Sequence, residues 1–308
     1  MNPIAVIPCM FGAFCMLCVA CGAAPQAERE SAGSAAKPAL AADSTTAPAS
    51  SPSSSSSATV LLDRLEERGR TMREFTASIV VEQFSALTEE REVRRARIVM
   101  KGGGGLWNSI GIVVDEFIDA SGRGTTDGRR FLFQDGWLIE IDPTRKQAVK
   151  RQLVRAGGAF DPLRIGEGPF VVPLGQPRAA IEREYMVSDA AIPDHGFFKT
   201  LRSTPDGLLA LRLVPREGTV AHRNMRSVVL VFDGATLAPR GVELTRPNGD
   251  TERVLLRESV IDGGIDESQA AVIALPDMTG WRVDERPLPP SGADGEASPA
   301  QPPREPRG

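Results

Sequence analysis

Short segments in which apolar and polar residues alternate fill most of the chain between residues 75 and 275. A period of two places successive side chains on opposite faces of a β-strand. Turn dipeptides separate several segments, and Asp135-Gly136 and Asn248-Gly249 are typical of tight hairpins. The pattern therefore predicts an antiparallel sheet with strand segments at 75–81, 91–100, 110–120, 130–134, 137–142, 146–154, 197–201, 208–214, 227–232, 240–245, 251–261 and 271–275.

Apolar residues recur at the spacing of a helix in only a few segments of the sequence. After Thr59, a candidate N-cap, apolar residues recur at the spacing of one helix face: Leu61, Leu62, Leu65 and Met72. Two shorter helices are expected in the middle of the chain, because Pro162 and Pro177 suit the first helical position. The second of these covers residues 177–185.

The order of these elements limits the fold class. Strands do not alternate with helices, so a parallel nucleotide-binding sheet is not expected. An antiparallel sheet of this width curls, and its apolar face needs a covering layer. One long helix and two short ones are too few to cover it. The sequence therefore predicts a mainly β (α+β) domain, an antiparallel unclosed β-barrel of about ten or eleven strands with an N-terminal helix, short lid helices and an apolar cavity.

The two ends of the chain differ from this middle part. Residues 1–21 are uncharged and apolar, as in a signal peptide. Residues 22–58 consist mainly of Ala, Ser, Pro and Thr, which predicts a disordered tether. Residues 286–308 are rich in Pro and Gly and are predicted to be a disordered tail. The expected folded domain is therefore 59–285.

All four cysteines lie in the leader, at positions 9, 15, 18 and 21. The stretch Leu17–Cys21 resembles a bacterial lipobox, with Cys18 where a small or aliphatic residue is usual. Three outcomes stay open: lipidation of Cys21, ordinary cleavage near Gly22 or Ala24, and an uncleaved anchor. With two histidines and no cysteine after the leader, neither a metal site nor a cofactor is predicted.

No catalytic residues are predicted, and the chain is expected not to be an enzyme. The formal net charge of −4 argues against a nucleic-acid partner. Gly102–Gly105 lacks the Lys-Ser/Thr ending of a phosphate-binding loop, and Asp194-His195 has no recognisable nucleophile. The acidic stretch 262–267 lacks the ligand spacing of a calcium loop. Each of these segments is interpreted as a turn.

One basic cluster has two interpretations. Its four arginines are Arg91, Arg94, Arg95 and Arg97, and three glutamates lie among them or just before them. On a strand these side chains divide between the two faces, which favours a solvated outer face. A patch for lipid headgroups or for a protein partner is the alternative.

The apolar strand positions are the candidate ligand site. Large apolar and aromatic side chains recur there, and methionine and aromatic groups adapt to varied apolar ligands. Ordinary core packing beneath the helices is the competing interpretation. The candidate cavity-lining residues are Phe75, Ile79, Val81, Ile98, Met100, Phe117, Phe131 and Trp137.

Several motifs occur in an order known from one family. The first is the strand start Phe75–Ala77, followed by the hairpin Phe133–Leu138 and by Ile141–Pro143. Leu211–Pro215 and Val229–Asp233 follow late in the chain. In this order the sequence resembles the periplasmic outer-membrane lipoprotein carriers and acceptors, the LolA/LolB-like superfamily. The resemblance extends over residues 59–275.

The resemblance implies an unclosed barrel that buries the acyl chains of lipids or lipoproteins on the periplasmic side of a Gram-negative-type envelope. A lipidated N-terminus would hold it at a membrane surface. In the carriers an arginine helps to lock the lid, and Lys101 stands at the matching position. Lysine lacks the planar fork of arginine, so Lys101 is a lid-lock candidate without the arginine's donor geometry. Lipoprotein sorting or transport is the function expected, and an envelope sensor or scaffold that binds a partner protein is the alternative.

Overall fold

The computed structural model describes residues 57–103, 106–155, 176–202 and 207–288. The chain divides into two units, Met1–Ser56 and Ser57–Gly308, and all described residues belong to the second. The predicted signal peptide, Cys21, nearly all of the tether, the helix expected at Pro162 and the tail beyond residue 288 therefore lie outside the described residues.

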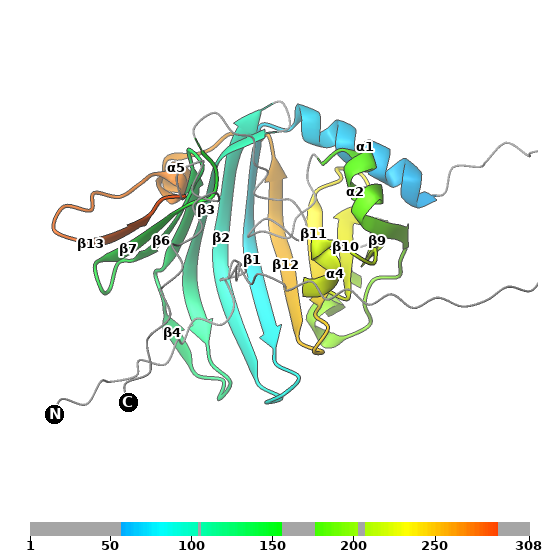
Figure 1. Ribbon diagram of the computed structural model, residues 1–308, viewed down its shortest axis with the longest axis horizontal. Coiled ribbons are helices and arrows are strands. Elements are labelled where there is room, and N and C mark those ends of the chain that lie inside the picture. The colour runs from blue at the N-terminus through cyan, green and yellow to red at the C-terminus, as the bar shows by residue number, and fades with distance from the viewer. Residues whose placement is uncertain (1–56, 104–105, 156–175, 203–206, 289–308) are drawn as a thin grey trace, which may run out of the picture. The chain divides into compact units, whose positions relative to one another are not determined.

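The described part is built on one thirteen-stranded sheet (Figure 1). Neighbouring strands are antiparallel except β13 and β7, which are parallel. The strand order is β13-β7-β6-β5-β3-β2-β1-β12-β11-β10-β9-β8, with β4 paired to β3, so the sheet is an unclosed half-barrel with edges at β13 and β8. The strands are β1 (Glu74–Phe84), β2 (Arg91–Gly103), β3 (Leu106–Ile118), β4 (Gly124–Thr126), β5 (Arg130–Gln134), β6 (Trp137–Asp142), β7 (Gln147–Gln152), β8 (Tyr185–Asp189), β9 (Leu208–Pro215), β10 (Ser227–Asp233), β11 (Pro239–Thr245), β12 (Thr251–Ile261) and β13 (Arg282–Arg286).

Helices flank both faces of this sheet. They are α1 (Ser57–Thr71), α2 (Arg178–Glu184), the 3-10 turn η1 (Gly196–Phe198), α3 (Lys199–Arg202), α4 (Val220–Asn224) and α5 (Glu267–Ile273). The predicted amphipathic helix is α1. It begins at Ser57, two residues before the expected cap, and it buries Leu61, Leu62 and Leu65 along one side.

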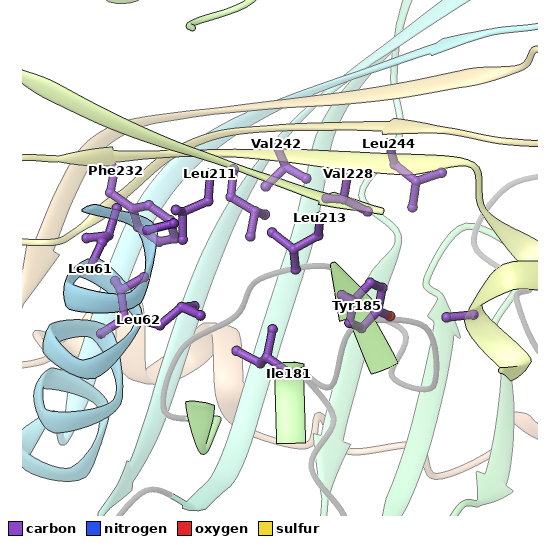
Figure 2. Packing of buried hydrophobic residues seen from close by; sticks show 14 of the residues in the cluster. Leu61, Leu62, Ile181, Tyr185, Leu211, Leu213, Val228, Phe232, Val242 and Leu244 are labelled. Atoms are coloured by element: carbon purple, nitrogen blue, oxygen red, sulfur yellow. The ribbon is translucent and has the colours of Figure 1, made fainter. Parts of the chain in front are cut away.

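The inner face of the sheet is defined here by contact with α1, α2 and α4. Figure 2 shows Leu61 and Leu62 of α1, with Ile181 of α2 and Tyr185, opposite leucine and valine side chains of the sheet. This cluster extends over one half of the sheet, on strands β8, β9, β10, β11 and β12. It includes Leu211, Leu213, Val228, Leu230, Phe232, Val242 and Leu244.

The outer face carries two separate covering segments. Around Gly241 of β11, Phe198 and Leu201 pack on the sheet, and a Cβ on this glycine would lie 2.9 Å from Cε1 of Phe198. At Gly111 of β3, α5 lies so close that a Cβ would overlap the carbonyl oxygen of Val272. Two glycines on the outer face therefore make room for the covering helices.

Two predicted strands are wrong. Residues 197–201 form η1 and α3, and residues 271–275 include the end of α5. Phe198 and Leu201 are three residues apart and are both buried, which suits a helical turn. Asp266 and Gln269 form a capping box at the start of α5.

Three strands were not predicted: β4, β8 and β13. Strand β8 begins at Tyr185, where the prediction continued the preceding helix. Strand β13 has four charged residues out of five and shows no alternation. It extends to Arg286, one residue into the predicted tail.

Candidate ligand-binding face

Four strands present a continuous apolar surface on the inner face. Residues in register on neighbouring strands share a face, so the pairing of β1, β2, β3 and β5 arranges side chains in rows. The first two rows are Phe75, Met100, Ile110 and Phe133, then Ala77, Ile98, Ile112 and Phe131. The third row is Ile79, Ala96 and Val114. All eleven side chains are buried.

Seven of the eight predicted cavity-lining residues lie together on this surface. They are Phe75, Ile79, Val81, Ile98, Met100, Phe117 and Phe131. Sequence reasoning missed Ile110, Ile112 and Val114 of β3, and Phe133 of β5. Strand β3 is apolar on both faces near its start, so alternation alone did not tell which side chains point inward. The register with β2 makes that assignment.

Trp137 and Lys101 are not part of the inner face. Trp137 is in register with Gln134 and Gln152, and it packs with Leu132, Ile139 and Ile141 in a cluster on the outer face. The alternation within β6 was right, but the direction assigned to Trp137 was wrong. Lys101 follows the inward-pointing Met100 and is exposed on the outer face. It is therefore not placed to lock a lid over the inner face.

The inner face becomes polar toward the β1–β2 hairpin. The fourth row is Val81, Arg94 and Phe117, and the fifth contains Gln83 and Glu92. The Arg94 guanidinium lies 4.9 Å from the centre of the Phe117 ring. It donates to Gln83 Oε1 at 2.6 Å and to Glu92 Oε2 at 3.1 Å. Arg94 is thus a largely buried cation at one end of an apolar surface.

Glu252 of β12 completes this polar end, because it is in register with Gln83. Arg246 Nη2 donates to its Oε2 at 3.4 Å. Burial raises the pKa of Glu252 above its ordinary value, although Arg246 and Arg94 act in the opposite direction. Burial also lowers the pKa of the Arg94 guanidinium. The buried positions of Glu252 and Arg94 therefore cost solvation free energy.

Glu252→Gln is expected to raise the free energy of unfolding at neutral pH. Because the folded-state pKa of Glu252 is raised, its contribution to stability is present at low pH and is lost as the pH rises through that pKa. The variant and the wild type should therefore differ little near pH ~4 and more near pH ~7. Urea unfolding at both pH values checks this, and a difference that shrinks as the pH rises would contradict it.

The basic cluster of β2 divides between the two faces, as predicted. Arg95 and Arg97 point outward, where Arg95 pairs with Glu116 at 3.0 Å and Arg97 pairs with Asp115 at 3.0 Å. The Arg95 side chain is 61% exposed, and the Arg97 side chain is 50% exposed. The outer part of the cluster is therefore paired and solvated, and Arg94 alone among these three turns inward.

The remaining sequence motifs have structural roles in the described residues. His195 Nε2 lies 2.5 Å from Glu243 Oε2 and links the segment before η1 to β11. Asp262 Oδ1 accepts from the backbone N–H groups of Arg73 and Glu74, at 2.8 and 3.0 Å. This carboxylate joins the end of β12 to the start of β1.

The described residues contain no group of three or more His, Cys, Asp or Glu side chains arranged to hold a metal ion. Among the helices built from them, none combines the length and the apolar character needed to cross a membrane.

Comparison with known proteins gave matches among solved structures only. No family model and no curated protein matches the chain. Similar structures include a putative outer membrane lipoprotein-sorting protein domain from Vibrio parahaemolyticus, with a TM-score of 0.33, 12% identity, and coverage of 68% of this chain and 94% of that one. MucB has a TM-score of 0.38, 14% identity, and coverage of 74% and 65%.

A third similar structure is the LolA superfamily protein NE2245 from Nitrosomonas europaea, with a TM-score of 0.29, 14% identity, and coverage of 69% of this chain and 96% of that one. The strand order of this chain forms the unclosed half-barrel that the resemblance implied. The function proposed below rests on the geometry of the chain itself.

Proposed function

We propose that this chain is an envelope binding protein that holds acyl chains of lipids or lipoproteins against its inner face. One observation carries the proposal. The apolar inner surface continues over β1, β2, β3 and β5, whereas the cluster formed with α1, α2 and α4 lies on strands β8–β12. In the described residues, the helices of the inner layer thus lie on one half of the sheet. The other half, whose apolar side chains are buried in the structure, is the half that we propose receives the hydrocarbon.

The physical chemistry of this surface favours hydrocarbon. Burial of an acyl chain contributes about 0.8 kcal/mol per methylene group, before the costs of association. Met100, Phe75 and Phe131 offer adaptable and aromatic contacts beside the small side chains of Ala77 and Ala96. Binding of this kind needs no reaction at the site, so the proposal is for a binding protein and not an enzyme.

The proposed place of action is the periplasmic side of the envelope. The leader residues 1–21, with the lipobox-like stretch that ends at Cys21, support export and membrane attachment. Lipoprotein sorting or transport is the cellular process in which such a binder would act. Mass spectrometry of the mature N-terminus tests the attachment, since a free N-terminus beyond Cys21 would rule out lipidation at that residue.

Phe117→Glu is expected to weaken acyl-chain binding at least ~10-fold, because it places a carboxylate beside Arg94 at the border of the apolar surface. The probe is dansyl-labelled undecanoic acid, and its fluorescence reports transfer to an apolar site. Val113→Glu is the matched control, since Val113 lies on the same strand, faces outward and is in register with Arg97 and Arg130. Circular dichroism checks that both variants keep the β-sheet.

Two results would overturn the proposal. One is a wild-type protein that shows no saturable binding of the probe and yields no lipid on extraction. The other is an equal loss of binding in Phe117→Glu and Val113→Glu with both folds intact. A wild-type protein that purifies without lipid but with one stoichiometric protein partner would favour the sensor or scaffold alternative.

A further inference from the structure

The inner face has a direction, set by the order of its rows. On β1, β2, β3 and β5, the rows nearest the junction of α1 and β1 contain only apolar side chains, from Phe75 and Met100 to Ile79 and Ala96. Beyond β5 the first two rows continue with Arg151 and Glu140, which pair with each other at 3.7 Å. Charged and amide groups begin at Arg94 and continue with Gln83 and Glu92 toward the β1–β2 hairpin. On these four strands polarity therefore rises in one direction.

Solvent exposure follows the same direction. Phe75, Met100 and Ile110 in the first row are 1%, 0% and 1% exposed. Gln83, Arg94, Phe117 and Glu252 at the hairpin end are each partly exposed. A molecule that lies along the inner face thus meets water at the hairpin end and hydrocarbon at the other.

Arg94 supplies hydrogen-bond donors where polarity begins. A guanidinium has five N–H donors, and it suits the geometry of carboxylates and phosphates. The bonds to Gln83 and Glu92 come from Nη1 and Nη2. Phe117 lies against the guanidinium and holds it at the border of the apolar rows.

The acidic groups near Arg94 do not exclude an anion. Glu92 pairs with Arg94 itself at 3.1 Å, but its side chain is 42% exposed, so water can take the place of the guanidinium as its partner. Glu252 is paired with Arg246, and burial favours its neutral form. Asp127 is bound by Arg129, whose Nε donates at 2.5 Å. Glu252 and Asp127 thus have cations of their own, and Glu92 has water as a second partner.

We propose that the hairpin end of the inner face is a headgroup site. A bound amphiphile with a carboxylate or phosphate head lies with its head beside Arg94 and its hydrocarbon chain toward Phe75 and Met100. This inference rests on the proposed acyl-chain binding and adds the orientation and the headgroup class of the ligand. It also assigns Arg94 as the residue that recognises the head.

The orientation is tested by quenching of Trp107 with spin-labelled stearic acids. Trp107 is buried on β3, three residues before Ile110, at the end away from the hairpin. Full-length protein carrying Trp137→Phe and Trp281→Phe leaves Trp107 as the fluorophore. Stearate labelled near the chain end, at carbon 16, is expected to quench more than stearate labelled near the head, at carbon 5. Stronger quenching by the carbon-5 label would overturn the orientation.

The role of Arg94 is tested by Arg94→Gln, with Arg97→Gln on the outer face of the same strand as the matched control. Arg94→Gln is expected to weaken stearate binding about 10-fold and to leave binding of methyl stearate unchanged, because only the carboxylate uses the guanidinium. Equal losses for both ligands, or no loss for stearate, would overturn the headgroup site.

The two proposals fail in different ways. Wild-type protein that binds neither stearate nor methyl stearate overturns acyl-chain binding and the headgroup site with it. Binding of both ligands by the wild type, with reversed quenching or without an effect of Arg94→Gln, overturns only the inference drawn here. The quenching experiment uses protein with Arg94 unchanged, so it tests the orientation even if the Arg94→Gln variant folds poorly.

Discussion

Gly111→Ala is expected to lower the free energy of unfolding by about 2 kcal/mol, because the added Cβ would overlap the backbone of α5. The nearest atom is the carbonyl oxygen of Val272, and the Cα of Ile273 lies 3.1 Å from the built Cβ. Backbone atoms cannot move aside as the end of a flexible side chain can. The helix must therefore shift away from β3.

The shift should extend beyond α5. Val272 is the buried residue of α5, and the following segment places Met278 and Trp281 against the cluster of Leu132, Ile139 and Ile141. Hydrogen exchange in residues 267–288 is thus expected to rise more than exchange in β1 or β2. Urea unfolding gives the change in stability.

Gly196→Ala is the matched control for this substitution. No heavy atom lies within 4 Å of a Cβ built on Gly196, and its backbone conformation is open to other residues. Its effect should remain within about 0.5 kcal/mol. Equal stability changes in the two variants would show that α5 does not press on Gly111.

Glu82→Leu is expected to lower the free energy of unfolding by about 3 kcal/mol, because it removes one partner from a buried ion pair. Glu82 is 5% exposed on the outer face, and its Oε1 lies 2.6 Å from Nη1 of Arg253. Arg253 also donates to Glu243 Oε2 at 2.9 Å, and Glu243 in turn contacts His195. Loss of Glu82 leaves the poorly solvated Arg253 guanidinium paired with Glu243, and it also removes the partner that Arg91 contacts at 3.3 Å.

The control is Glu116→Leu, which removes the partner of Arg95 on the same face. The Arg95 and Glu116 side chains are 61% and 36% exposed, so water and salt already screen this pair. Its loss should cost less than about 1 kcal/mol. Chemical denaturation measures both variants, and a Glu116→Leu effect as large as that of Glu82→Leu would contradict the importance of burial.

Strands with one apolar and one polar face could be predicted from the sequence, and β1, β2, β9 and β12 show why. Their alternation matches the two environments that a curled sheet offers, so the pattern and the structure agree. The prediction of strands failed where the spacing of apolar residues fits both a strand and a helix. Phe198 and Leu201 became part of a helical cap because Gly241 leaves space for them on the outer face.

The candidate site, too, could be predicted from the sequence only in part. Alternation on β1 and β2 placed Phe75, Ile98 and Met100 on one face correctly, because these strands are long and regular. Trp137 was assigned to the wrong face, since the hairpin motif gives no information about which side of the sheet its side chains meet. The inward direction of Arg94 and the position of Glu252 opposite Gln83 depend on register between strands distant in sequence.

The sequence by itself determined the antiparallel sheet, the opening amphipathic helix and the division of the arginines between two faces, because these follow from side-chain periodicity within single segments. Only the tertiary structure decided which half of the inner face receives α1, α2 and α4, where α5 and η1 rest, and where the inner face turns polar. These features depend on contacts between distant parts of the chain. Strand β1 pairs with β12 as well as with β2, and Ser78 and Glu258, which meet across the β1–β12 pair, are 180 residues apart in the sequence. Local patterns carry no information about such pairing, since many registers satisfy the same alternation.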